Sequence, residues 1–287
     1  MCIILLIGKQ YCIDEEKRMT RAVYPSDLSP SEWSILEPLI PPTKPGGRKR
    51  DTPMQEILNG VFYVLRSGCS WRMLAHDLPP WQTVYGYYNN WRKAGIWEKM
   101  NDTLRTAIRE KEGRESEPSA AIIDSQTVKA TAIKGIRGYD GGKKMKGRKR
   151  HILVDTLGLL LVVLVHSAGI SEKAGGKMLL QRAHQKGFSR LSLIWADGGY
   201  NGEPIRTWVQ RLAGWLFTVV KRPDDTSGFV LLPRRWVVER TFSWFNNYRR
   251  LSKEYEVLPE TSESMLYAAM VHIMVRRLAR STVPRKH

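Results

Sequence analysis

The sequence has few cysteines, a deficit of acidic side chains and no long apolar run. Its three cysteines, Cys2, Cys12 and Cys69, show no Cys-x-x-Cys or Cys/His spacing. This excludes a disulfide scaffold and a finger-type zinc site, and it is typical of a reducing cytoplasm. No uninterrupted apolar run exceeds seven residues, whereas a membrane helix needs about 20, so no membrane partner is expected. No glycine loop ends in Lys-Ser or Lys-Thr, so no nucleotide cofactor is expected.

The composition instead indicates a folded protein that binds a polyanion. Lys and Arg number 46 against 28 Asp and Glu, which gives a net charge of +18. Nucleic acid is the first candidate partner for so basic a chain. A hydrophobic content of 42%, with ten Trp and eleven Tyr, excludes a disordered protein. The 287 residues suffice for one large or two ordinary domains.

The first eighteen residues do not resemble part of a fold. Their apolar start has no basic n-region and no small-residue cleavage site, so a secretory signal is not indicated. Met19 opens a more plausible native start. We therefore interpret residues 1–18 as a non-native or disordered extension.

Residues 19–110 have the pattern of short helices separated by tight breaks. Ser29 and Pro30 open the first helix, Gly68 closes the second, and Pro79-Pro80 precedes a third that runs to Lys93. This pattern predicts a small all-α domain of helix-turn-helix type that binds DNA. Aromatic side chains of the third helix are assigned mostly to the core, and Arg92 is assigned to DNA contact.

After a charged linker at 111–119, the pattern changes to that of an α/β domain over residues 120–287. Short apolar segments predict strands at 120–124, 151–157, 159–166, 191–196 and 215–220. Helical spacing predicts helices at 171–186, 203–212, 234–250 and 261–280. The first three strands would form an antiparallel meander, and the alternation after them requires parallel neighbours. The fold class is therefore α/β, with a mixed sheet flanked by helices.

Three acidic residues occur at positions where a carboxylate is unusual or lies near a ligand edge. Asp124 is in a strand otherwise made of Ala and Ile, and Asp197 directly follows a buried strand, where ligands bind in open α/β sheets. Glu239 is the acid of a basic helix. Each of them alone is more often structural, for example a helix pair between Glu239 and Arg235. If they converge, their oxygens suit Mg²⁺, and two such ions can cleave a phosphodiester.

Other acids are interpreted as structural. Asp155 begins a hairpin turn, Asp140 is in a glycine-rich segment, and Glu172 is in the first turn of a helix, where the dipole favours it.

Residues 134–150 are rich in basic side chains and glycine, and they interrupt the sheet near Asp124. A basic run is usually only a solvated tail, but this position favours a mobile clamp on DNA phosphates. The side chains assigned to DNA contact are Lys143, Lys144, Lys146, Arg148, Lys149, Arg150, Arg92, Arg235, Arg249 and Arg250.

Several of these segments, taken in order, resemble a known enzyme family. They are Ile-Asp-Ser-Gln-Thr-Val-Lys at 123–129, Lys-Gly-Arg-Lys-Arg-His-Ile at 146–152, Asp-Thr-Leu-Gly at 155–158, Ala-Asp-Gly-Gly-Tyr at 196–200 and Trp-Val-Val-Glu-Arg-Thr-Phe at 236–242. This set is similar to that of bacterial insertion-sequence transposases, in particular insertion-sequence group five, and the resemblance extends from about residue 24 to residue 280.

The resemblance implies a DDE catalytic core of ribonuclease-H type in which Asp124, Asp197 and Glu239 hold two Mg²⁺ ions, with Mn²⁺ able to substitute. It implies cleavage and strand transfer of double-stranded DNA in cut-and-paste transposition. The N-terminal helices would recognise the terminal inverted repeats. Pairing of two element ends implies at least a dimer on DNA, and the expected location is the cytoplasm, in association with the nucleoid.

Three questions stay open at this point. A hairpin-forming group has a Tyr, Arg, Glu, Lys signature, which Arg235 and Glu239 match but Leu232 and Asn246 do not. An inactive DNA-binding regulator or decayed element would keep the charge without cleavage. A tyrosine recombinase would use Tyr248 as its nucleophile and would need no metal, but it would leave Asp124 and Asp197 unexplained.

Overall fold

The structure is a computed structural model that describes residues 21–43, 50–131, 134–220 and 235–280. The extension predicted at 1–18 and the signature position Leu232 lie outside the described residues. Within the described part, no helix is both long enough and apolar enough to cross a membrane.

The N-terminal region is helical, as predicted. Its α-helices are α1 (Pro30–Leu36), α2 (Met54–Ser67), α3 (Trp81–Lys93) and α4 (Ile96–Lys111). A capping box opens α1, because Ser29 Oγ accepts from the Glu32 amide and the Glu32 carboxylate accepts from the Ser29 amide. Gly68 ends α2 with φ of 77°, a left-handed conformation that glycine adopts without strain. Between α2 and α3 the chain forms the single 3-10 turn Trp71–Met73.

The chain then forms one mixed sheet. Its strands are β1 (Ala120–Lys129), β2 (Gly138–Asp140), β3 (Met145–Asp155), β4 (Leu160–Ser167), β5 (Leu193–Ala196) and β6 (Leu216–Val219). The order across the sheet is β2-β3-β1-β5-β6, and β4 also pairs with β3. Strands β1, β3 and β4 are antiparallel neighbours, whereas β5 runs parallel to β1 and β6 parallel to β5. The predicted meander and the predicted parallel half are both confirmed.

The basic segment at 134–150 differs from the prediction. It contains β2 and the first half of β3, so it is a β-hairpin that continues the sheet and not a loop. Strand β1 is correspondingly longer than predicted, and its pairing with β3 extends from Ala121 to Lys129. Charged side chains can occupy these central strands because most of them are paired inside the protein, as described below.

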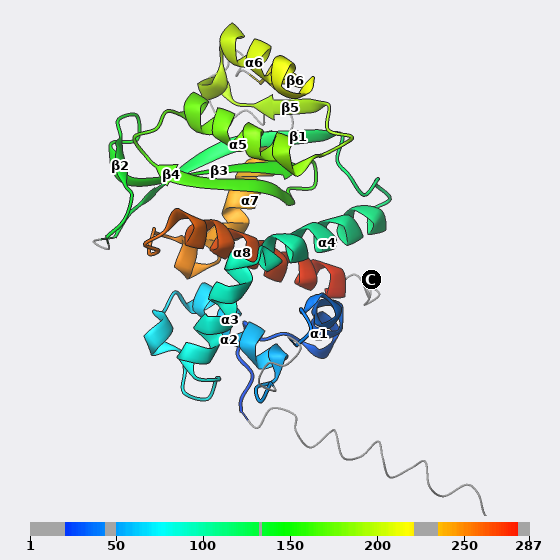
Figure 1. Cartoon of the computed structure of the whole chain (residues 1–287), viewed down its shortest axis with the longest axis vertical. Coiled ribbons are helices and arrows are strands. Elements are labelled where there is room, and N and C mark those ends of the chain that lie inside the picture. The colour runs from blue at the N-terminus through cyan, green and yellow to red at the C-terminus, as the bar shows by residue number, and fades with distance from the viewer. Residues whose placement is uncertain (1–20, 44–49, 132–133, 221–234, 281–287) are drawn as a thin grey trace, which may run out of the picture.

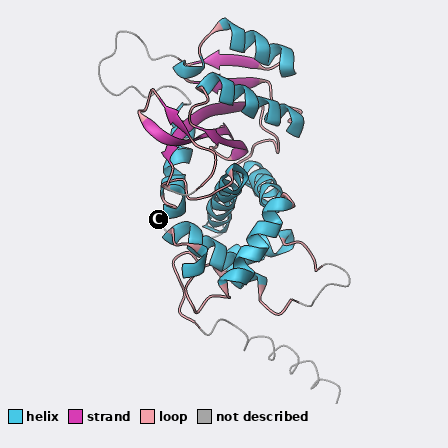
Figure 2. Cartoon of the chain, turned by 60° about the vertical axis from the view of Figure 1, so that its left-hand side comes forward, coloured by secondary structure: helices cyan, strands magenta, loops and turns pink. Residues whose placement is uncertain are grey.

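Helices cover both faces of the sheet (Figures 1 and 2). Helices α5 (Glu172–Lys186) and α6 (Glu203–Ala213) pack on one face, where Ile123 joins Leu179 and Leu180 in a buried cluster. Helices α7 (Arg235–Asn246) and α8 (Pro259–Arg280) lie on the other face, where Ile122 packs with Val238. This is the ribonuclease-H-like arrangement of a mixed sheet between helices. The helix predicted at 234–250 ends at Asn246, and Arg249–Leu251 form a separate 3-10 turn.

Helix α8 connects the two halves of the molecule. Figure 1 shows α4 and α8 between the sheet and helices α1–α3. On α8, His272 stacks on Phe62 with ring centroids 4.2 Å apart, and the Thr261 carbonyl accepts from the Tyr88 hydroxyl at 2.9 Å. The helical region, α8 and one face of the sheet therefore share a continuous hydrophobic core.

Candidate active site

Asp124 and Asp197 come from neighbouring parallel strands. The register of β1 and β5 pairs Ala120 with Leu193 and Ile122 with Trp195. Asp124 is two residues beyond Ile122 on β1, and Asp197 is two residues beyond Trp195, directly after the end of β5. Both side chains are half-buried. Because side chains alternate along a strand, Asp124 shares the face of Ile122, which is the face that α7 covers.

The turn after β5 fixes the Asp197 side chain. Asp197 caps the 3-10 turn Gly198–Tyr200, and its Oδ1 accepts from the Gly199 amide at 3.0 Å. A Cβ added at Gly199 would lie 2.1 Å from Glu172 Oε2 and 3.1 Å from Asp197 Oδ1. A side chain at position 199 would therefore displace the Glu172 carboxylate. At Asp124, Oδ1 accepts from the Ser125 amide at 2.7 Å.

Tyr200 is the last residue of the 3-10 turn after Asp197, and its side chain is fully buried. Burial raises the pKa of the Tyr200 phenol well above its usual value. The negative charges that raise this pKa further belong, in order of effect, to Asp124, Glu172 and Asp197.

Glu239 comes from α7. Its side chain is exposed, whereas Val238 and Thr241 on the same helix are buried. The Thr241 hydroxyl donates to the Gly158 carbonyl at 2.8 Å. The turn at Gly158 adjoins the amino end of β1, because Asp155 pairs with Ala121. Residues two apart on a helix point about 200° apart, so Glu239 points away from that turn.

The oxygen donors at this edge fit a magnesium ion. Within the ranges that the structure describes, no three His, Cys, Asp or Glu side chains are close enough to enclose a metal ion. Mg²⁺, however, usually keeps several waters and binds through one or two carboxylates together with substrate phosphates. Asp124, within β1, and Asp197, directly after β5, supply two carboxylates from adjacent strands. The donor set is all oxygen, which suits Mg²⁺ and does not suit a thiolate-binding metal.

Three of the basic residues predicted to bind DNA are buried. Arg148, Lys149 and Arg150 are 2%, 4% and 2% exposed. Arg150 donates to the Leu251 carbonyl at 2.7 Å and pairs with Glu254 at 3.3 Å. Arg148 pairs with the other oxygen of Glu254 at 3.6 Å, and Lys149 pairs with Asp140 at 3.4 Å.

Arg250 is buried as well. It is 9% exposed, pairs with Glu256 at 2.6 Å and donates to the Cys69 carbonyl at 3.1 Å. Charges that are buried and paired with acids cannot also neutralise phosphates. These side chains tie β3 and the segment after α7 to the rest of the fold.

The other predicted DNA contacts remain accessible. Lys143, Lys144 and Lys146 are exposed at the β2–β3 turn, and Arg249 is exposed after α7. Arg92 is half-buried, and Asn89 Oδ1 accepts from its guanidinium at 2.9 Å. The side chain of Arg235 lies outside the described part.

Two of the acids interpreted as structural have that role. Asp155 is fully buried, pairs with Arg109 at 2.6 Å and accepts from the amides of Leu157 and Leu159. Asp140 accepts from the Thr127 hydroxyl, and this hydrogen bond lowers the pKa of Asp140 to about 2.

The arrangement around Tyr248 does not suit a recombinase nucleophile. Tyr248 is 3% exposed, and its hydroxyl lies 3.2 Å from His272 Nδ1 inside the shared core. Burial raises the pKa of this phenol.

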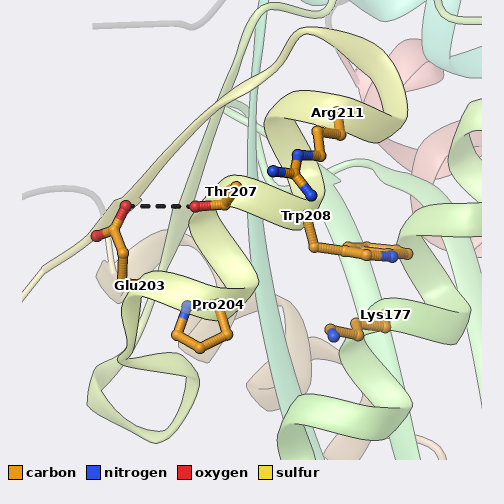
Figure 3. Close-up of a pocket in the computed structure, with 6 residues that line it drawn as sticks. All are labelled: Lys177, Glu203, Pro204, Thr207, Trp208 and Arg211. Carbon is orange, nitrogen blue, oxygen red and sulfur yellow. Dashed lines mark hydrogen bonds between the residues drawn. The ribbon is translucent and has the colours of Figure 1, made fainter.

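A shallow groove lies elsewhere, between α5 and α6 (Figure 3). The Lys177 ammonium lies 5.2 Å from the centroid of the Trp208 ring, and Thr207 Oγ1 is 3.4 Å from Glu203 Oε1. None of the predicted site residues lines this groove.

Comparison with known proteins identifies the family. Residues 28–101 match the family described as "Putative transposase of IS4/5 family", and residues 115–274 match the family described as "Transposase DDE domain". The second match covers more than half of the chain. The chain therefore belongs to the DDE transposases, which are polynucleotidyl transferases, and its N-terminal region is that of the IS4/5 group.

Three curated relatives are similar to parts of the chain. The "Insertion element IS402 uncharacterized 16.2 kDa protein" of Burkholderia cepacia is 28% identical over 34% of this chain and 69% of its own length. The "Putative transposase for insertion sequence element IS402" of the same organism is 29% identical over 38% of this chain and 54% of its own length. "Uncharacterized protein y4sN" of Sinorhizobium fredii is 26% identical over 40% of this chain and 87% of its own length. The chain thus spans only about half the length of the IS402 transposase.

Sequence reasoning did not assign Glu172, Ser125 and Tyr200 to this edge of the sheet. The direction of strand β4 in the sheet explains the position of Glu172. Strand β4 runs parallel to β1, because both are antiparallel to β3, so its carboxyl end lies at the same edge as those of β1 and β5. Glu172 follows that end.

Proposed function

We propose that this protein binds the terminal inverted repeats of a mobile element, nicks the DNA in a Mg²⁺-dependent reaction and joins the freed 3′ hydroxyl to target DNA. The observation that carries the proposal is the parallel pairing of β1 with β5, which brings Asp124 within β1 and Asp197 directly after β5 to neighbouring strands, in a chain of this family. Both steps are in-line substitutions at phosphorus, so one site can serve both.

In this proposal Asp124 and Asp197 hold the divalent cations, two per site, and Mn²⁺ can substitute. A bound pair of cations activates the attacking water and stabilises the charge on the leaving oxygen. Glu239 is proposed as the third acid of the site. The orientation of α7 supports this role, because Glu239 is exposed on the side away from Thr241 and the Gly158 turn.

DNA binding is assigned to the exposed basic side chains and the helical region. Lys143 and Lys144 lie in the hairpin turn between β2 and β3, and Lys146 lies at the start of β3. Asp140 stabilises this turn by accepting from the Lys143 amide at 3.1 Å. Together with Arg249 these lysines would contact phosphates, and the N-terminal helices would read the inverted repeats. Pairing of two ends makes the active form a dimer on DNA, in the cytoplasm with the nucleoid.

The test uses purified protein and a duplex that contains the inverted repeats found beside the gene. We expect cleavage with Mg²⁺ or Mn²⁺, none in EDTA, and none for Asp124→Asn, Asp197→Asn or Glu239→Gln, with end binding retained. Glu203→Gln, an exposed acid on α6, is the matched control and should cleave normally. Binding without cleavage by the wild type would indicate an inactive regulator, and cleavage in EDTA would overturn the metal mechanism.

A further inference from the structure

Helix α3 packs one of its sides against α2, α4 and α8. Val84 and Tyr88 on this side are fully buried, and the Tyr88 hydroxyl donates to the Thr261 carbonyl of α8 at 2.9 Å. Gly60 on α2 permits the close contact with α3, because a Cβ added there would lie 3.0 Å from both methyl groups of Val84. This side of α3 is therefore fixed by the core of the helical region.

The opposite side of α3 carries polar side chains around a glycine. Gln82, Gly86 and Asn90 follow one another at intervals of four residues, so they lie in a row along the helix. Each is two residues away from Val84 or Tyr88, which turns the row about 200° away from the core side. Gln82 and Asn90 are exposed to solvent. We call Gln82, Gly86 and Asn90 the outer row of α3.

Gly86 is a second observation, independent of the polar side chains. A glycine inside a helix is unfavourable relative to alanine, because its backbone loses more conformational freedom on folding. Close packing against Val84 accounts for Gly60, but a Cβ added at Gly86 would meet no atom within 4 Å in the described part of the chain. Packing inside the described fold therefore does not require this glycine. It does allow another molecule to approach the backbone of α3 closely.

The charge around the outer row suits a polyanion. Residues Trp81–Lys93 of α3 include neither Asp nor Glu. Arg72, in the turn before α3, is exposed, and its guanidinium carbon lies 5.1 Å from the centroid of the Trp81 ring. This cation–π contact places a positive charge beside the first turn of α3.

The side chains of the outer row suit the edges of bases. Gln and Asn each carry a carboxamide, which can donate and accept hydrogen bonds at once and so pair with adenine in the major groove of DNA. That groove is wide enough to admit an α-helix. Duplex DNA therefore matches both the charge and the hydrogen-bonding groups of this side of α3.

We propose that α3 lies in the major groove of the terminal repeat with its outer row toward the bases. Gln82 and Asn90 contact base edges, Gly86 allows the helix backbone to approach them, and Arg72 contacts a phosphate. This inference rests on the proposed function, because it assigns the reading of the inverted repeats to one side of one helix.

The test measures, by fluorescence anisotropy, the affinity of the full chain for two duplexes of equal length. One carries the inverted repeat found beside the gene, and the other carries the same bases in permuted order. We expect Gln82→Ala and Asn90→Ala each to weaken binding to the repeat at least about fivefold and to leave binding to the permuted duplex unchanged, because base contacts carry the sequence preference. Arg72→Ala should weaken binding to both duplexes alike. Gln210→Ala, at an exposed glutamine on α6, is the matched control and should bind both duplexes like the wild type.

Gly86→Leu separates the DNA contact from folding. Leucine is a better helix former than glycine, so the thermal midpoint should not fall. Affinity for the repeat should fall at least about tenfold, because the added side chain holds the helix away from the bases. Should Gly86→Leu fail to fold, the two alanine variants of the outer row decide the inference by themselves.

If Gln82→Ala, Asn90→Ala and Gly86→Leu all keep the wild-type preference for the repeat, the inference is wrong and the proposed function stands. If the wild type itself does not prefer the repeat, the proposed reading of the inverted repeats is wrong. Analytical ultracentrifugation without DNA completes the test. A smaller assembly for Gly86→Leu than for the wild type would show that the outer row joins two copies of the chain, and it would overturn the inference.

Discussion

The guanidinium of Arg150 on β3 forms a buried ion pair with Glu254, Nη2 to Oε2 at 3.3 Å, across 104 residues of sequence. Both side chains are almost fully buried, at 2% and 3% exposure. A basic residue in a Lys- and Arg-rich segment of a DNA-binding protein is thus a structural group. Burial lowers the pKa of Arg150, and the charge of Glu254 opposes that shift.

Replacing Arg150 should therefore reduce stability more than DNA affinity. Arg150→Ala leaves the Glu254 carboxylate buried with a lost partner, which costs about 3–5 kcal/mol of unfolding free energy. Urea unfolding followed by circular dichroism measures this loss. Lys146→Ala, an exposed position on the same strand, should change stability by less than about 0.5 kcal/mol. Equal stability of the two variants would contradict the structural role.

The exposed lysines of the β2–β3 turn should show the opposite pattern. Replacing Lys143, Lys144 and Lys146 together by Ala should weaken DNA binding while leaving the fold intact. If each lysine neutralises one phosphate, the slope of log affinity against log salt should become shallower by roughly 2–3. Fluorescence anisotropy across a salt series measures the slope, and an unchanged slope would exclude this turn from the DNA interface.

Adjacent glycines after Asp197 provide a matched pair. Gly199→Ala places a methyl group 2.1 Å from Glu172 Oε2 and 3.1 Å from Asp197 Oδ1, so the Glu172 carboxylate must move away from the turn that holds Asp197. At Gly198 an added Cβ meets nothing within 4 Å. We expect Gly199→Ala to lower the cleavage rate at least tenfold and Gly198→Ala to change it less than about twofold. Similar rates in the two variants would show that the spacing of Glu172 and Asp197 is unimportant.

Stability should fall as the pH is lowered below about 6.5. Burial lowers the pKa of His151 to about 3 and that of His272 well below its usual value, so both are neutral in the folded chain. The unfolded chain binds protons near pH 6.5. Between pH 6.5 and the lower pKa values of the folded state, the unfolded chain therefore binds more protons than the folded chain. Each such histidine then lowers the free energy of unfolding by up to about 1.4 kcal/mol per pH unit.

Urea unfolding at pH 7, 6 and 5 measures this dependence. His272→Gln lowers stability at pH 7 but should make the pH dependence shallower, because one buried neutral imidazole is lost. An identical pH slope in wild type and variant would show that His272 is protonated in the folded state.

The sequence carried enough local information to select Asp124 and Asp197 as candidate site residues. An acid inside or directly after a short apolar strand is conspicuous, and parallel strands bring their carboxyl ends to one edge. The position of Glu172 beside β1 was not predictable in this way, because Glu172 and the exposed Glu203 are both the first residue of a helix. Only the path of β4, which sets α5 beside β1, separates the two.

The structure of the basic segment at 134–150 could not be predicted for a related reason. Its lysines and arginines form one run in the sequence, but strand pairing divides them into a solvated turn and a buried strand. Partners such as Glu254 and Glu256 lie about a hundred residues later. Charge patterning alone carries no information on such distant pairs, so burial in β3 became visible only with the sheet register.

Helix α8, near the end of the chain, completes the core of helices α1–α4 at its beginning. During synthesis, the core of helices α1–α4 can therefore close only after residues 259–280 have been made. A chain interrupted before α8 would lack part of the core of the helical region as well as one of the helices that cover the sheet.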